Sequence, residues 1–295
     1  MSVPDDRHPT PRDRPARRGP AGRTWLAAAV LLAWIGVAGL HARRVHFPSR
    51  PERLSRAART LPPGDAWYAL TAAGKRAGWA RRQVDTLAGG GFLVREEITW
   101  DLPDLPGTGR SQARLAAWLD AGLALDSLRF DGVADGDTVR LTAAVEGDSV
   151  LVLDGGERRP VDGPPQLAAT WPLRFAADAA AREEGGEIAV PLFEPATRTV
   201  RELRLRVGAS RLRVWPDSAD TDSLTGAWFA AREDSARAWR LERVQGALRL
   251  ATWVDEDGRV VEADLPGGLH MERTAFELAF LAGRGPAEGE PEGTP

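Results

Sequence analysis

Cysteine is missing from this sequence of 295 residues, and lysine and histidine are scarce: Lys75 is the only lysine, and there are four histidines. The missing thiol excludes disulfides, cysteine nucleophiles and cysteine-ligated zinc or iron–sulfur clusters. Because a chain without thiols suits oxidising and reducing surroundings alike, composition leaves the compartment open. Three histidines lie at or before His46, so His270 alone serves the rest of the chain. Catalytic zinc usually needs two or three histidines, which this region cannot supply.

Recognisable catalytic and nucleotide-binding motifs are also missing. No G-x-S-x-G elbow is present, the glycines near 107–109 lack the third glycine of a dinucleotide loop, and there is no Walker lysine. Asp217, Asp220 and Asp222 lack the spacing of an EF-hand, so we interpret 216–225 as a solvated acidic loop. Carboxylates are plentiful, but the sequence singles out no pair for glycoside hydrolysis. We therefore expect no enzymatic activity, no catalytic residue, no cofactor and no metal.

Charge is distributed unevenly along the chain. The 39 Lys and Arg residues nearly balance the 42 Asp and Glu residues, for a formal net charge of −3. Up to Arg59, however, 12 arginines accompany 4 acids, which leaves 27 basic and 38 acidic residues, a net −11, for the remainder. Nucleic acids are bound by neutralising phosphates with Lys and Arg. A body of this charge predicts no nucleic-acid partner.

An uncharged stretch lies between Arg23 and Arg43. It covers 24–42, 19 residues that include the apolar run WLAAAVLLAWIGVAGL. As an α-helix these residues would reach about 28 Å, close to the hydrocarbon thickness of a bilayer. A cleaved signal peptide is the alternative, but the run is long for one and ends without a clear small-x-small site. The sequence predicts a single transmembrane anchor.

The orientation of this anchor is not decided by charge, since six arginines precede it and six follow by Arg59. Long domains are translocated largely regardless of charge, so we expect a cytoplasmic N-terminus and a periplasmic or other extracytoplasmic body on a bacterial inner membrane. Composition divides the rest of the chain. We expect a disordered Arg/Pro-rich tail over 1–23, a basic linker over 43–64 and a disordered acidic tail over 283–295.

The remaining residues, 65–282, are predicted to form one β-rich domain, because apolar and polar residues alternate along them. The clearest examples are Val139, Leu141, Ala143 and Val145, then Leu203, Leu205 and Val207, then Leu212 and Val214. Period-two alternation buries one face of a strand and is typical of antiparallel sheets. The glycines at 89–91 and the Asp/Gly pairs at 131–132, 147–148 and 257–258 predict tight turns between strands. We expect about ten to twelve strands.

Two helices are predicted beside these strands. One follows Thr170, with Pro172 in its first turn, an Ala-rich stretch to Ala181 and glycines 185–186 at its end. The other lies near 274–282, where Phe276, Ala279 and Phe280 have helical spacing. The predicted fold class is therefore mainly β (α+β): one N-terminal transmembrane helix, then a large antiparallel curved sheet or open barrel with one or two helices.

Three segments of the β-rich region resemble a known pattern. They are Trp67–Leu70 with Gly74, Gly78 and Trp79; PLFEPAT at 191–197; and WVDEDGRV at 253–260 followed by GLHMER at 268–273. Together they resemble the uncharacterised β-rich region that precedes transglutaminase-like domains in some exported bacterial proteins, and more distantly the curved-sheet lipoprotein carriers. The resemblance implies architecture and an envelope location. It implies no transglutaminase activity, because no such domain follows and no cysteine is present.

Tryptophans occur throughout the body, from Trp67 to Trp253. Most are expected to fill the core, but aromatic side chains also line carbohydrate and lipid pockets. Trp79, Trp100 and Trp118 lie on consecutive predicted strands, which predicts a possible ligand groove if they share one concave face.

Three functions remain open from the sequence. The first is a membrane-anchored, non-enzymatic binding or accessory module of the bacterial envelope, with an unidentified protein, lipid or glycan partner. The second is a lipid- or lipoprotein-handling protein with an apolar cavity inside its curved sheet. The third is a hydrolase that uses His270 with a serine or an acid. A large apolar cavity would favour the second, and a cleft at His270 with a bonded serine would favour the third.

Overall fold

The computed structural model describes residues 32–35, 37, 49–101, 111–134, 136–147, 150–161, 163–245 and 248–280. The chain divides into two compact units, Met1–Ser49 and Arg50–Pro295. In the first unit, 32–35 and 37 are helical, but most of the predicted anchor and both predicted tails lie outside the described residues. Within the described ranges, no helix combines the length and apolar character needed to cross a bilayer.

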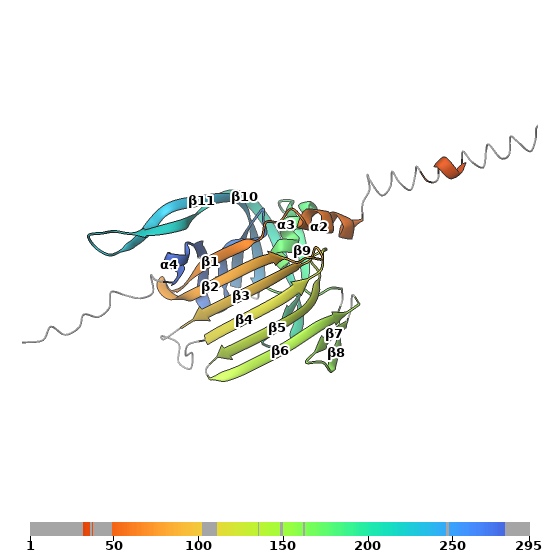
Figure 1. Cartoon of the computed structure of the whole chain (residues 1–295), viewed down its shortest axis with the longest axis horizontal. Coiled ribbons are helices and arrows are strands. Elements are labelled where there is room, and N and C mark those ends of the chain that lie inside the picture. Colours follow the sequence, from red (N-terminus) through yellow and green to blue (C-terminus); the bar gives the residue numbers. More distant parts are fainter. Residues whose placement is uncertain are drawn as a thin grey trace, which may run out of the picture. The chain divides into compact units, whose positions relative to one another are not determined.

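The second unit is built around one antiparallel sheet, which confirms the mainly β prediction (Figure 1). Fourteen strands are found in the described residues, somewhat more than expected, in the spatial order β8-β7-β6-β5-β4-β3-β2-β1-β14-β13-β12-β11-β10-β9. Their bounds are β1 Gly64–Ala72, β2 Lys75–Thr86, β3 Phe92–Trp100, β4 Ser111–Leu119, β5 Leu125–Ala134, β6 Asp137–Glu146, β7 Val150–Leu153, β8 Glu157–Pro160, β9 Glu187–Glu194, β10 Thr199–Thr221, β11 Trp228–Gln245, β12 Leu248–Asp255, β13 Val260–Leu265 and β14 Leu269–Thr274.

Strand register explains which residues face the inside of the curved sheet. Tyr68 pairs with Ala80, and Ala80 pairs with Ile98, so these side chains form one row across β1, β2 and β3. Ile98 in turn pairs with Ala113 of β4. Because side chains alternate between faces, every second residue along each strand joins this inner face. The buried clusters that form the core are built on it.

The sheet curves until strands from its two ends meet. Arg198, in the turn between β9 and β10, pairs with Asp154 beyond β7 at 3.1 Å. Arg159 of β8 donates a hydrogen bond to the carbonyl oxygen of Arg198. A short parallel bridge joins Gln166 to Leu192 of β9. These contacts join the two ends of the sheet through side chains and a connecting segment. The end strands β8 and β9 do not pair with each other, so the arrangement is an open barrel.

The helix predicted after Thr170 packs into the core of the curved sheet. The helix α3, Trp171–Ala177, has Pro172 in its first turn as predicted and buries Leu173 and Phe175. Its continuation is a 3-10 turn, η1 (Ala179–Arg182), because the chain becomes extended at Asp178. A 3-10 turn, η2, covers Pro266–Gly268, and the predicted last helix is α4, Phe276–Phe280.

The segment predicted as a linker, 43–64, is not one throughout. Residues Arg50–Ala58 form helix α2, and Leu54, Ala58 and Leu61 are buried in the same cluster as Leu173 of α3. The linker interpretation rested on the arginines and prolines of this stretch. The apolar residues at helical spacing pack on α3, and this burial makes the segment a helix despite its arginines and prolines.

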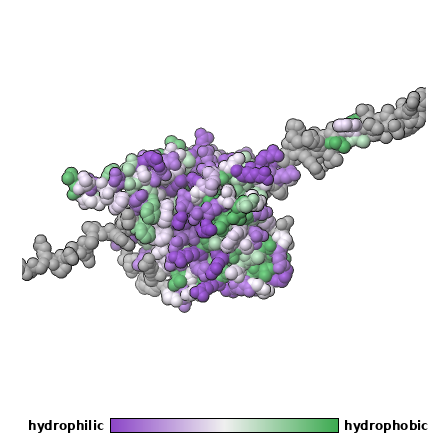
Figure 2. Space-filling model, viewed as in Figure 1, coloured by the Kyte–Doolittle hydropathy of each residue, from purple (hydrophilic) through white to green (hydrophobic). Residues whose placement is uncertain are grey.

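The strands β10 and β11 are unusually long and form an arm beyond the sheet (Figure 1). The predicted acidic loop at 216–225 is shorter than expected, since β10 continues to Thr221 and the turn begins at Asp222. Leu212 and Val214 were expected to be buried but are 70% and 51% exposed. In the described part of the chain, β10 and β11 pair only with each other along this stretch, and no described residue covers the face that carries Leu212 and Val214. Figure 2 shows apolar residues at the end of the arm.

Two of the glycine signals have different structural roles. Gly258 has a φ of 75° in the turn between β12 and β13, as predicted, and a Cβ there would lie 2.6 Å from the Cα of Leu173. Gly132 was expected in a turn but lies inside β5, paired with Ala113. A Cβ on Gly132 would meet the ring of Phe130 at 2.9 Å, so the glycine makes room for that ring on the inner face.

Candidate functional site

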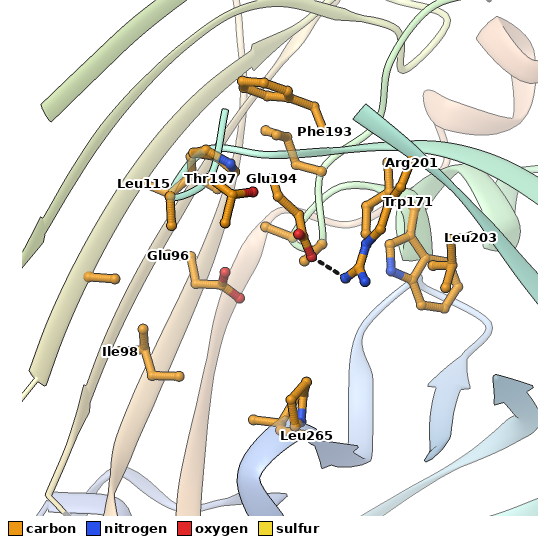
Figure 3. A pocket seen from close by; sticks show the side chains of 18 of the residues that line it. Glu96, Ile98, Leu115, Trp171, Phe193, Glu194, Thr197, Arg201, Leu203 and Leu265 are labelled. Carbon is orange, nitrogen blue, oxygen red and sulfur yellow. Dashed lines mark hydrogen bonds and ion pairs between the residues drawn. The ribbon is translucent and has the colours of Figure 1, made fainter. Parts of the chain in front are cut away.

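A cavity of about 500 Å³ lies inside the curved sheet (Figure 3). One wall comes from β3, β4 and β5, and the opposite wall from β9 to β13 with the segment 167–171 before α3. The cavity therefore exists because distant parts of the chain curl towards each other. Its volume falls in the range of about 300–1,000 Å³ that is typical of small-molecule sites.

The lining is predominantly apolar. Ile98, Leu115 and Phe130 face the cavity from neighbouring strands, in the register that also forms the core. The opposite wall adds Trp171, Leu192, Phe193, Leu203, Leu250 and Leu265. Such a surface favours the apolar body of a ligand, because apolar area removed from water stabilises a complex by roughly 25 cal/mol per Å².

The segment PLFEPAT contributes much of one side of the cavity. Residues 192–197 all line it, from the end of β9 into the turn before β10. Glu194 forms an ion pair with Arg201 of β10, and Figure 3 shows both side chains at the cavity wall. The Nε atom of Arg201 is buried and has no hydrogen-bond partner in the described part of the chain. This pair is therefore only partly satisfied.

A second ion pair lies on the opposite wall. Arg82 of β2 is only 6% exposed and donates to Glu96 of β3 from Nη2 at 2.5 Å and from Nε at 3.1 Å. Burial tends to lower the pKa of Arg82, but Glu96 and Tyr68 outweigh it and the pKa is raised. Burial raises the pKa of Tyr68, whose hydroxyl has no hydrogen-bond partner among the described atoms.

Arg243 of β11 is the third arginine at this site and differs from the other two. It is half-buried, lines the cavity, and its side chain makes no hydrogen bond or ion pair with any described residue. Burial, and then the nearby charge of Arg201, lower the pKa of Arg243, while Glu194 acts in the opposite direction. An arginine remains charged under these conditions, so the cavity holds a cation that no described side chain pairs with directly.

Another buried ion pair lies outside the cavity. Arg273 of β14 donates to Asp255 at 3.3 Å, and its guanidinium lies 4.1 Å from the ring centroid of Trp215. Burial raises the pKa of Asp255 to about 6, although backbone hydrogen bonding by Arg259 and the charge of Arg273 oppose the shift. This group joins the arm to the sheet and is part of the structural core.

The three tryptophans of the predicted groove are not brought together. Trp100 pairs with Gly78 and packs against the inner cluster, whereas Trp79 is next to Gly78 in β2 and points to the other face. Trp79 contacts Phe280 of α4 there. Trp118 is also on the outer face, about six residues, or roughly 20 Å, further along the sheet. Ligand binding by any of them stays a prediction.

His270 is half-exposed on β14, as its alternation predicted. Its Nδ1 atom lies 3.1 Å from Asp264, and its Nε2 atom lies 3.8 Å from Glu262. The recorded neighbours are thus carboxylates rather than a serine hydroxyl. Among the residues that the structure describes, no group of three or more His, Asp or Glu side chains could hold a metal ion.

Sequence reasoning did not identify the cavity arginines. The resemblance did include the segment 191–197, and that segment proves to be cavity wall. Arg243 has no comparable signal, because its role depends on strand pairing: its register partners are Leu205 and Leu250. That register places a guanidinium in an otherwise apolar row.

Comparisons with known proteins found little. No family model matches the chain, and no curated protein matches it. A β-barrel-like protein of the domain of unknown function DUF1849 from Brucella abortus is similar in structure, with 16% identity, a TM-score of 0.48, and coverage of 72% of this chain and 95% of its own. A DUF1089 family protein from Pseudomonas aeruginosa has 15% identity, a TM-score of 0.39, and coverage of 70% and 92%. The transglutaminase-associated setting stays a prediction, and the chain is established here as a β-rich domain.

Proposed function

We propose that the protein is a non-enzymatic binding protein that holds a small ligand with an apolar body in the cavity of its curved sheet. The observation that carries this proposal is the cavity itself, about 500 Å³ and lined mainly by apolar side chains from both halves of the sheet. Ligand pockets in proteins generally combine such a lining with a few polar groups that orient the ligand. Glu96, Glu194 and Arg201 are polar groups of this kind.

The cavity supports one of the functions that the sequence left open more than the others. A lipid-handling protein requires an apolar space inside the sheet, and that space is present. A hydrolase based on His270 has less support, because the side chain lies among acids without a serine bonded to it in the described residues. Binding without catalysis is the simpler account of the site.

The proposed setting is the bacterial envelope, with the body held at the inner membrane on its extracytoplasmic side. This part of the proposal is supported by the sequence: the uncharged stretch 24–42 and the resemblance to exported β-rich regions. A protein held at the membrane surface would meet lipids and lipid-linked molecules. A fixed acceptor for such molecules is consistent with a permanent anchor.

The arm supports a second function, as an accessory module that docks another envelope component. Leu224 in its turn is 94% exposed, and Phe229 at the start of β11 is 49% exposed. Exposed apolar groups on a projecting hairpin are typical of interaction sites. Docking by the arm and binding in the cavity are compatible within one protein.

Native mass spectrometry of the full chain, purified from membranes in a neutral detergent, tests the cavity proposal. Wild-type protein is expected to carry a co-purified small molecule. Leu115→Trp fills the cavity from β4 and should abolish this extra mass, whereas Ala116→Trp places the same ring on the outer face and should retain it. Wild-type protein without any bound molecule, and without affinity for added single-chain amphiphiles, would contradict the proposal.

A further inference from the structure

The cavity lining contains both acids and arginines, and their pairing is unequal. Glu96 is paired with Arg82, Glu194 with Arg201, and Asp264 with His270. The side chain of Arg243 has no ion-pair or hydrogen-bond partner among the described residues. The positive charge that remains available to a ligand is therefore at Arg243.

The surroundings of Arg243 favour an anion beside its guanidinium. Its cross-strand neighbours, Leu205 and Leu250, are apolar, and Leu205 is buried. The nearby charge of Arg201 repels it, and Glu194, which attracts it, is already bonded to Arg201. Desolvating a cation without a compensating anion is unfavourable, so an anion that reached this position would be stabilised.

The chemistry of the side chain narrows the ligand further. A guanidinium offers parallel N–H donors that match the two oxygens of a carboxylate or phosphate. The rest of the cavity, including Ile98, Leu115 and Leu203, is suited to a hydrocarbon body. A polar anion such as free phosphate would leave this apolar lining without a partner.

From these observations we propose that the cavity binds an anionic amphiphile, with its carboxylate or phosphate head group at Arg243 and its hydrocarbon body along β3–β5. This inference rests on the proposed function and specifies its ligand class. Arg201 and Glu194 adjust the site, because their mutual pairing limits how much positive charge Arg201 offers to the head group.

Three probes with the same hydrocarbon chain test the head group: dodecanoate, dodecyl phosphate and dodecanol. Each is titrated into the full chain in neutral detergent micelles, and bound probe is counted by native mass spectrometry. An anionic probe is expected to bind about tenfold more tightly than dodecanol, the factor that one charge-assisted hydrogen-bonding group commonly gives. Tighter binding of dodecanoate indicates a fatty-acid type of ligand, and tighter binding of dodecyl phosphate indicates a phospholipid type.

Variants assign this preference to one residue. Arg243→Gln should lower anion affinity about tenfold, to the level of dodecanol, and leave dodecanol binding unchanged. Arg243→Lys should keep most of the preference. The control is Arg240→Gln, on the same strand but on the outer face, where it is 45% exposed and paired with Glu242. Glu194→Gln releases Arg201 and should increase anion affinity several-fold, a result that does not depend on Arg243→Gln being stably folded.

The outcomes separate the two proposals. If dodecanol binds as tightly as both anions, or if Arg243→Gln and Glu194→Gln bind them like the wild type, the head-group inference is overturned while the proposed function stands. If no probe binds the wild-type chain, both the proposed function and the inference fail.

Discussion

Glu96 and Glu97 are neighbours in β3 that face opposite sides of the sheet. Each pairs with an arginine, and the two arginines differ greatly in exposure. Glu97 on the outer face pairs with Arg114 at 2.9 Å, and that arginine is 65% exposed. Glu96 on the inner face pairs with Arg82, which is 6% exposed. Outer-face pairs such as Arg81–Asp65 and Arg95–Asp85 repeat the first arrangement along the sheet, where Figure 2 shows hydrophilic residues.

Buried and exposed ion pairs affect stability differently. Exposed ion pairs contribute about 0–1 kcal/mol each, so the outer face is mainly a solvated surface whose charges add little to stability. A buried pair adds little net stability, but removing one partner leaves an unpaired buried charge, which is strongly destabilising. Charged residues on the inner face are therefore few and mostly paired, and removing a partner is costly. Arg243 has no such partner among the described residues, and the proposed anionic ligand is inferred from this.

The largest expected effect separates the two glutamates. Glu96→Ala leaves the buried Arg82 without its partner and should lower the free energy of unfolding by about 3 kcal/mol. Glu97→Ala on the outer face should lower it by less than about 1 kcal/mol. Urea denaturation of both variants measures the contrast. Equal losses would show that the two faces do not differ as described, and Arg82→Met with Glu96→Met should recover most of the larger loss.

Asp255 extends the comparison to pH. Its pKa is raised from 3.8 to about 6 by burial, so the folded state binds its proton more tightly than the unfolded state does. Its contribution to stability is therefore full below about pH 4 and is lost as the pH rises through about 6. From pH 7 to 4.5 the wild type should gain about 2 kcal/mol relative to Asp255→Asn.

Denaturation of both proteins at the two pH values measures this difference, and general acid effects cancel because both chains share them. Burial is the main cause of the raised pKa, and the neighbouring charges that modify it are Arg273, Asp257 and Arg259. A difference between the two proteins that is independent of pH would contradict the assignment.

Filling the cavity should have a smaller effect on stability and the opposite sign. Leu115→Trp replaces empty space with apolar contacts and should raise the free energy of unfolding by about 1 kcal/mol while it removes ligand binding. Ala116→Trp on the outer face should change neither quantity appreciably. Thermal unfolding beside probe titration measures both. A Leu115→Trp protein that still binds amphiphiles would place their site elsewhere.

The smallest effect is expected on the arm. Leu212→Thr alters a side chain that is 70% exposed and should change the free energy of unfolding by less than about 0.5 kcal/mol. Leu205→Thr, on the same strand but 3% exposed, should cost several times more. A comparable loss at both positions, measured by urea denaturation, would mean that another part of the protein covers the arm.

Leu205 and Leu212 also show how much of the fold could be predicted from the sequence. Both alternate with arginines in the same way, and alternation correctly predicted that they belong to antiparallel strands. Alternation does not show how many strands lie beside a segment. Beyond Ser210, β11 is the only strand that pairs with β10 in the described part of the chain, so an identical pattern gives a buried residue in one place and an exposed one in the other.

The candidate site illustrates the same limit. Residues 191–197 could be singled out before the structure because the motif is contiguous. The cavity needed the pairing of β3, β4 and β5 and the curvature that brings them opposite β10 and β11. Arg243 is one of many arginines in the sequence, and only its strand register places it at the cavity. Helix α2 was missed for a related reason, since its apolar residues are few and lie among arginines.

A crystal structure of the protein with bromine-labelled dodecanoate tests the central claim most directly. Anomalous scattering locates the bromine independently of any model of the chain. We predict a bromine peak inside the curved sheet beside the apolar lining and a carboxylate within hydrogen-bonding distance of the Arg243 guanidinium. A peak on the outer face or on the arm, with the cavity empty, would contradict the account.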